Sequence, residues 1–163
     1  MTVALKHRKS IRLKEYNYSM SGEYFITICT FDHECVFGEI VDNYMQLSPA
    51  GTILKQCWEG IPFHFSNVEL DDYIIMPNHI HGILMLRERT VGAEYIQPLP
   101  QKTFQHVIPN SIPSIVHSFK ADVTRSYRKK NYQDFFWQRN YYERIICNEK
   151  ELNSIRDYIY PVR

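Results

Sequence analysis

Two histidines separated by one residue are the side chains whose types and spacing first suggest chemistry. His79 and His81 lie in the segment MPNHIHGIL, residues 76–84. In a β-strand, residues two apart project from the same face, so both imidazoles would point the same way. Such a pair can bind a divalent metal ion, whereas a purely structural role would bury two polar rings side by side in an apolar strand. Because short patterns also arise by chance, the pair alone leaves both interpretations open.

A tyrosine on the last predicted helix is the second candidate. In the helical projection, Tyr158 lies beside the apolar stripe of Leu152, Ile155 and Ile159, so its hydroxyl could reach over a sheet edge. The chain has 12 tyrosines, and an ordinary packing role is the more frequent one for a residue of this type. As a nucleophile, a hydroxyl with a pKa of about 10 needs a base, a water chain or a nearby cation.

Length and composition indicate a single globular domain over residues 1–163, with 44% hydrophobic and 23% charged residues. No apolar run approaches the length of a membrane span, and the basic start has no apolar signal segment, so we predict a cytoplasmic protein without membrane partners. The four cysteines form no CxxC pair, which argues against a zinc knuckle or a disulfide framework.

Basic residues are clustered although the net charge is only +1. One cluster lies in a basic lead segment, residues 1–22, and includes Arg8, Lys9 and Arg12; a second includes Lys120, Arg125 and Arg128. Clusters of this kind neutralise phosphates and give sequence-independent affinity for nucleic acid. The alternative, a solvated helix face, stays open on charge alone.

The sequence predicts an α+β fold, in which helices pack on an antiparallel sheet. β-branched and aromatic residues indicate strands over 24–31, 68–76, 79–86 and 135–146, the middle two forming a hairpin around Pro77-Asn78. Capping signals and apolar periodicity indicate helices over 48–62, 114–130 and from Asn148 onwards, the last with Glu151 at the third helical position. Prolines and weak periodicity indicate a long loop over 87–113.

Three motifs together carry a family resemblance. The segment MPNHIHGIL, followed by FWQRNYYERII and the terminal IRDYIYP, resembles the single-tyrosine HUH transposases, and more narrowly the REP-associated tyrosine transposases of mobile elements. The likeness extends over nearly the whole chain. The opening of that branch is resembled by Arg12, Tyr18, Gly22 and the strand YFITICT. Its first helix is resembled by Leu47-Ser48-x-x-Gly51.

The resemblance implies a ferredoxin-like, RRM-like HUH fold and a transposase activity. His79 and His81 would bind Mg²⁺ or Mn²⁺, and Tyr158 would be the nucleophile that cleaves and rejoins single-stranded, hairpin-bearing DNA through a 5′-phosphotyrosine intermediate. Joining would need no ATP, because the phosphotyrosine conserves the bond energy. The candidate DNA contacts are the six basic residues Arg8, Lys9, Arg12, Lys120, Arg125 and Arg128.

Four further residues are assigned by the same resemblance. Tyr141 and Tyr142 are rival nucleophiles, ranked lower because they precede the helix on which the family carries its tyrosine. Trp137 and Gln138 match the tryptophan-glutamine strand of the family and are assigned to the scaffold.

The sequence departs from the family pattern at its end. Val162 stands one helical turn after Tyr158, where an asparagine or glutamine commonly completes the metal site. Glu69, Asp71, Asp72 or water would then supply the missing oxygen ligand. Otherwise, the chain is a catalytically impaired or domesticated module that binds single-stranded nucleic acid.

A third alternative is a metal phosphodiesterase that acts through activated water and does not need Tyr158. The DNA target sequence and the choice between monomer and homodimer stay open.

Overall fold

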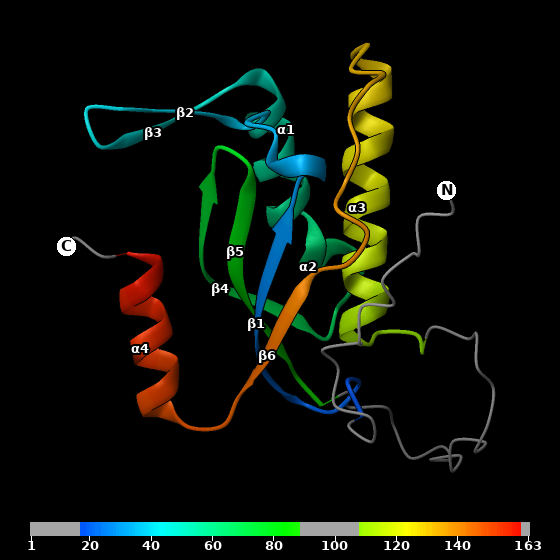
Figure 1. Ribbon diagram of the computed structural model, residues 1–163. Coiled ribbons are helices and arrows are strands. Elements are labelled where there is room, and N and C mark those ends of the chain that lie inside the picture. Colours follow the sequence, from blue (N-terminus) through cyan, green and yellow to red (C-terminus); the bar gives the residue numbers. More distant parts are fainter. Residues whose placement is uncertain (1–16, 89–107, 161–163) are drawn as a thin grey trace, which may run out of the picture.

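The computed structural model describes residues 17–88 and 108–160. Its centre is a four-stranded sheet of β1 (Gly22–Cys29), β4 (Val68–Met76), β5 (His79–Leu86) and β6 (Tyr142–Ile146) in the order β4-β5-β1-β6. Every pair of neighbours is antiparallel (Figure 1). This confirms the predicted α+β class and the hairpin around Pro77-Asn78, whose two strands begin and end where the sequence predicts.

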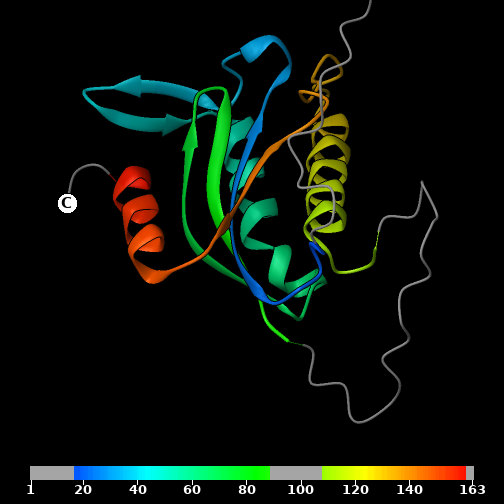
Figure 2. The ribbon, with the colours of Figure 1, turned by 60° about the horizontal axis from the view of Figure 1, so that its bottom comes forward.

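Helices cover both faces of this sheet, so that the sheet lies between α3 and α4 in both views (Figures 1 and 2). On one face, α1 (Pro49–Glu59) and α3 (Ile112–Lys129) enclose the main core, with Trp58 and Phe119 packed over Ile26 and Ile80. On the other face, α4 (Glu149–Ile159) closes a smaller cluster of Phe25, Ile83, Ile146, Leu152 and Ile159. Successive residues of β1 and β5 therefore point alternately into the main core and toward α4.

Side-chain caps fix the starts of α1 and α4, as the sequence predicts. The Ser48 hydroxyl accepts a hydrogen bond from the Gly51 N–H at 3.0 Å, and Pro49 occupies the first turn. The Asn148 side chain accepts from the Glu151 N–H at 2.9 Å. These caps satisfy N–H groups that have no partner inside the helix.

Several predicted boundaries are wrong. The first helix ends at Glu59 and is followed by the short α2 (Ile61–His64), because Pro62 has no N–H with which to continue the hydrogen bonds of the first helix. The helix predicted from residue 114 begins at Ile112, with Pro113 accommodated in its first turn. Most of the strand predicted over 135–146 is irregular: Trp137 forms an isolated bridge with Thr30, and the ladder of β6 starts only at Tyr142.

Two elements were not predicted at all. A hairpin of β2 (Gly38–Val41) and β3 (Tyr44–Leu47) precedes α1 and projects from the sheet (Figure 1). A short 3₁₀ turn, η1 (Phe31–His33), follows β1.

Some of the residues named in the sequence analysis fall beyond the described ranges. Arg8, Lys9, Arg12, Val162 and residues 89–107 of the predicted loop lie outside the described residues. No helix within the described ranges is long and apolar enough to cross a membrane. The four cysteines are free thiols.

Candidate functional site

His79 and His81 lie side by side on the face of β5 that is covered by α4. Their Nε2 atoms are 3.1 Å apart, and their ring centroids are 4.5 Å apart. Both side chains are half-buried, while Ile80 between them points into the main core. The predicted convergence of the two imidazoles is thus present in the fold.

Each imidazole makes a hydrogen bond through Nδ1 that orients its ring. His79 Nδ1 lies 2.7 Å from Asn78 Oδ1, and His81 Nδ1 lies 2.7 Å from Thr27 Oγ1. When both Nδ1 atoms carry the proton and donate it to these oxygens, both Nε2 lone pairs face the same point between the rings. Neither Asn78 nor Thr27 was singled out in the sequence; Thr27 is the direct partner of His81 across the β1–β5 ladder.

The surroundings keep both rings neutral. Burial, and then the neighbouring His79, lower the pKa of His81 from 6.5 to about 4. Burial, and then His33, lower the pKa of His79. Neutral imidazoles are the form that binds metal ions, so the site is poised for a cation at neutral pH.

The spacing of the two nitrogens fits a divalent cation. Two ligands at about 2.1 Å in adjacent octahedral positions lie about 3.0 Å apart, close to the 3.1 Å between the Nε2 atoms. Among the described residues, no third histidine, cysteine or carboxylate joins the pair. Glu69 is instead paired with Arg87, and Asp71 with Arg156, so the fold does not support the expectation that Glu69, Asp71 or Asp72 completes the set.

Tyr158 lies directly beside this pair. Its hydroxyl is 3.4 Å from His81 Nε2, and its ring meets the His81 ring edge-on at a centroid distance of 5.4 Å. Phe25 stacks on His81 at 5.3 Å and meets Tyr158 edge-on at 6.3 Å, which fills the space behind the two polar groups. The tyrosine itself remains 62% exposed, so a large substrate can reach its hydroxyl.

Three contacts fix the helix that carries Tyr158. Leu152 and Ile159 are buried in the smaller core cluster. The Arg156 guanidinium forms an ion pair with Asp71 at the irregularity in β4, with Nε donating to Oδ2 at 3.1 Å. Just beyond the helix, the Tyr160 hydroxyl donates to the Tyr73 carbonyl at 3.0 Å. The position of Tyr158 is therefore determined by contacts on both sides of it.

The two rival tyrosines occupy different places. Tyr141 packs against the main core cluster, away from the histidines. Tyr142 is 41% exposed, meets Phe25 edge-on at 6.4 Å and lines the same groove as Tyr158. The Tyr158 hydroxyl is the one that lies within 3.4 Å of His81 Nε2.

A groove of about 580 Å³ runs between β6 and α4 beside Tyr158. Arg144 and Lys150 contribute positive charge to its lining, and Arg144 is paired with Glu151. Neither basic residue was a sequence candidate, because each occurs singly rather than in a cluster.

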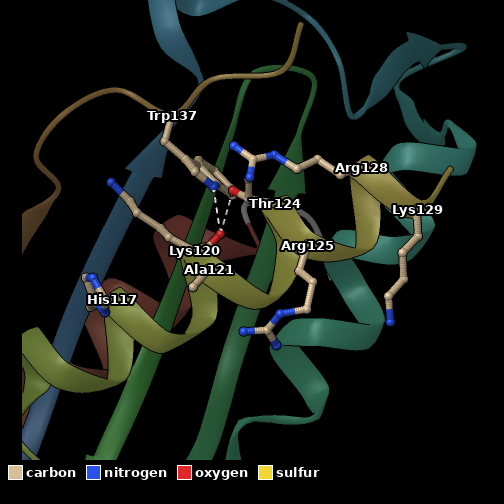
Figure 3. A pocket seen from close by; sticks show the side chains of 8 residues that line it. All are labelled: His117, Lys120, Ala121, Thr124, Arg125, Arg128, Lys129 and Trp137. Carbon is tan, nitrogen blue, oxygen red and sulfur yellow. Dashed lines mark hydrogen bonds between the residues drawn. The ribbon is translucent and has the colours of Figure 1, made fainter. Parts of the chain in front are cut away.

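The basic residues of α3 lie elsewhere. Lys120, Arg125 and Arg128 line a cavity of about 660 Å³ along α3, together with Trp137 (Figure 3). This helix packs on the sheet face opposite the histidines, so the fold does not bring the cluster to Tyr158.

Lys120 is partly committed to the fold. Its ammonium donates to the carbonyls of Gln138 and Asn140 at 2.9 and 3.1 Å, and lies 5.7 Å from the centroid of the Trp137 ring. Burial lowers its pKa from 10.5 to about 8. Trp137 in turn donates from Nε1 to the Lys120 carbonyl at 3.2 Å (Figure 3), which agrees with a scaffold role for this tryptophan.

The chain matches no protein-family model. It is 48% identical over 162 residues to an uncharacterized protein of Haemophilus influenzae, a match that covers 95% of this chain and 87% of that protein.

Two solved structures have a similar fold. A REP-associated tyrosine transposase bound to a REP hairpin superposes with a TM-score of 0.61 at 17% identity, over 92% of this chain and 71% of that one. A candidate transposase from Deinococcus radiodurans R1 superposes with a TM-score of 0.50 at 19% identity, over 93% of this chain and 97% of that one. The chain therefore belongs to one family with the Haemophilus influenzae protein, and its fold is that of the REP-associated tyrosine transposase.

Proposed function

We propose that the chain is a metal-dependent transposase that cleaves and rejoins single-stranded DNA with Tyr158 as its nucleophile. The observation that supports this most directly is the cluster of three groups: the two Nε2 atoms 3.1 Å apart and the Tyr158 hydroxyl 3.4 Å from one of them. A tyrosine in an ordinary packing role would not need its hydroxyl beside a neutral imidazole that is paired with a second one.

His79 and His81 would hold Mg²⁺ or Mn²⁺, which supplies charge stabilisation at the phosphate when bound. In cleavage, the Tyr158 oxygen attacks phosphorus and loses its proton to solvent water. The bond from phosphorus to the 3′ oxygen breaks, and that oxygen takes up a proton as it leaves. The products are a 5′-phosphotyrosine and a free 3′ hydroxyl.

Rejoining is the reverse of this step. A 3′ hydroxyl attacks the phosphotyrosine, the bond to the Tyr158 oxygen breaks, and the phenol regains its proton. One phosphodiester is exchanged for another, so no nucleoside triphosphate is consumed. The exposed position of Tyr158 suits such an exchange, because different 3′ ends must reach the same phosphorus.

The DNA strand would follow the groove between β6 and α4, where Lys150 and Arg144 offer positive charge. The cavity on α3 would contact a more distant part of the same DNA through Arg125 and Arg128. Unpaired DNA, and hairpins with single-stranded flanks, fit this course better than an uninterrupted duplex, because only a flexible strand can turn around the β6 edge.

The test is covalent capture. The protein is incubated with labelled single-stranded hairpin DNA and Mn²⁺, and adducts are separated on a denaturing gel and mapped by peptide mass. We expect an adduct on Tyr158 in the wild type and none in Tyr158→Phe. Tyr44→Phe is the matched control, because Tyr44 is 76% exposed on β3 and does not line this groove, so its variant should leave the adduct unchanged.

The competing functions give different results. Cleavage that persists in Tyr158→Phe would indicate a metal phosphodiesterase acting through water. Hairpin binding without any adduct, at every Mn²⁺ concentration, would indicate a binding module. His79→Ala should remove both Mn²⁺ binding and adduct formation under our proposal.

A further inference from the structure

Two exposed phenylalanines lie close together at the end of the sheet that carries the histidines. Phe31 is 58% exposed and Phe136 is 61% exposed. The N–H of Phe31 donates to the carbonyl of Phe136 at 2.9 Å, so the two residues are fixed on adjacent chain segments. Exposed apolar side chains that are contiguous, rather than scattered, often mark a binding site.

These residues line a pocket of about 670 Å³, a volume typical of ligand sites. We call it the aromatic pocket; it is formed by Phe31, Asp32, His33, Phe136, Trp137, Gln138 and Arg139. Its polar groups suit a nucleotide. Arg139 and His33 are exposed donors for a phosphate, and the Asp32 carboxylate and Gln138 amide can accept from the N–H groups of a base.

The aromatic pocket is physically joined to the histidine site through Asn78. One end of this amide accepts from His79 Nδ1 at 2.7 Å, and the other donates to the His33 carbonyl at 3.2 Å. The backbone reinforces the link, because the Thr30 N–H donates to the Asn78 carbonyl at 2.9 Å. The pocket and the site therefore hold a fixed distance from each other, as two contacts along one DNA strand require.

We propose that the aromatic pocket stacks an unpaired base of the DNA strand next to the phosphate that Tyr158 attacks. Stacking on phenylalanine is tolerant of base identity, because every base has a π-face. The stacked base would hold the DNA strand at a point beyond the scissile bond, on the side away from Tyr158. The scissile phosphate would then stay at the histidines. This inference rests on the proposed function and adds a base-binding subsite to it.

The first experiment measures binding without cleavage. Fluorescence anisotropy in EDTA compares a short labelled oligothymidine with the same oligomer in which abasic residues replace the thymidines. Both have the same phosphate charge and differ only in their bases. We expect the wild type to prefer oligothymidine, and the double variant Phe31→Ala, Phe136→Ala to lose about 5- to 150-fold in affinity for it, the range for one stacked base. Affinity for the abasic oligomer should not change.

Phe63→Ala is the matched control. Phe63 is 90% exposed on α2, outside the aromatic pocket, and its loss should leave both affinities unchanged. As a second measurement, an oligomer with 5-iodouridine is crosslinked by light to the wild type, and we expect the adduct on Phe31 or Phe136.

The outcomes separate the two proposals. Unchanged oligothymidine affinity in the double variant, with crosslinks elsewhere, would overturn the aromatic pocket and leave the proposed function intact if Tyr158 still forms its adduct. An equal loss for both oligomers would also overturn the pocket, because the phenylalanines would then support the fold rather than the base. A wild type that binds neither oligomer and forms no adduct would overturn both proposals.

Discussion

Replacing Gly82 by alanine should destabilise the protein, although alanine normally stabilises a strand relative to glycine by about 0.5–1 kcal/mol. Gly82 lies in β5 directly after His81 and faces the main core. A Cβ added there would lie 2.3 Å from Trp58 Cζ2 and 3.0 Å from Cε2 and Cη2 of the same ring. Carbon atoms in contact are about 3.5–4.0 Å apart, so the indole or the strand must move by about 1 Å.

The indole has little room to yield. Trp58 is 1% exposed, Phe119 meets it edge-on at 5.3 Å and Tyr73 lies at 6.1 Å. Overpacking of this kind costs about 1–3 kcal/mol. We therefore expect the free energy of unfolding to fall by about 2–3 kcal/mol, which corresponds to a decrease in Tm of about 4–12 °C for a chain of this size.

Urea denaturation of a double-mutant cycle is the assay. Trp58→Phe removes the ring atoms that the new methyl group would strike, so Gly82→Ala should cost less in that background, with a coupling energy of about 1–2 kcal/mol. Two results would refute the reasoning: a Gly82→Ala protein that is as stable as the wild type, or single effects that add within about 0.5 kcal/mol.

Three further predictions concern the contacts around the site. Asp71→Asn removes the ion pair that holds Arg156 of α4, and should lower the free energy of unfolding in urea by about 1–2 kcal/mol, since the pair is only partly buried. Asn78→Ala removes the oxygen that orients His79, and should weaken Mn²⁺ binding, as measured by calorimetry, about 10- to 100-fold. The Cys147 N–H and then Arg144 lower the pKa of the Glu151 carboxyl below its usual 4.5, so the carboxylate stabilises the fold above pH 4.5. This contribution is lost as the pH falls through the lowered pKa, so the Tm values of wild type and Glu151→Gln should differ at pH 7 and converge in acid.

Two of these predictions have a matched control variant. Glu69→Gln breaks an ion pair whose side chains are both 55% exposed, and should change the free energy of unfolding by less than about 0.5 kcal/mol. An Asp71→Asn effect no larger than this would show that the pair does not hold α4. Asn78→Asp keeps an acceptor for His79 and should restore Mn²⁺ affinity; a variant as weak as Asn78→Ala would count against the orienting role. Equal pH dependence of wild type and Glu151→Gln would contradict the third prediction.

Local signals made the hairpin and the helix starts predictable. The Pro77-Asn78 turn and the caps at Ser48 and Asn148 act within a few residues, so the sequence alone contains the interactions that form them. The β2–β3 hairpin also has a local signal that was missed. Asp42 and Asn43 adopt positive φ values of 50° and 66°, as a two-residue hairpin turn requires, and both residue types tolerate that conformation.

The irregular stretch before β6 could not be predicted from local pattern. Its aromatic residues favour a strand, and Phe135 and Trp137 are packed into the main core. The ammonium of Lys120, a residue of α3, donates hydrogen bonds to the carbonyls of Gln138 and Asn140. A tertiary contact thus competes with the strand ladder in this stretch.

The site also combines features that a local pattern predicts with features that depend on tertiary structure. The His79 and His81 pair follows from strand periodicity, and the resemblance supplies Tyr158 as a candidate. The orienting partner Thr27 lies 54 residues from His81 and depends on the register of β1 against β5, which no local signal specifies. The place of the α3 basic cluster on the opposite sheet face likewise depends on topology rather than on charge pattern.

The residues of β5 that face the main core determine which residues of β5 face α4, and so determine the position of the histidines. Ile80 and Leu84 are fully buried against α1 and α3, and Gly82 between them is the one position where the Trp58 ring can lie against the strand backbone. A slip of one residue would turn these groups toward α4 and bury the histidines in the main core, at a large cost in free energy. The same register that fills the core therefore places His79 and His81 together beneath Tyr158. This explains why a glycine directly follows the second histidine: it belongs to the packing of Trp58 and not to the chemistry of the site.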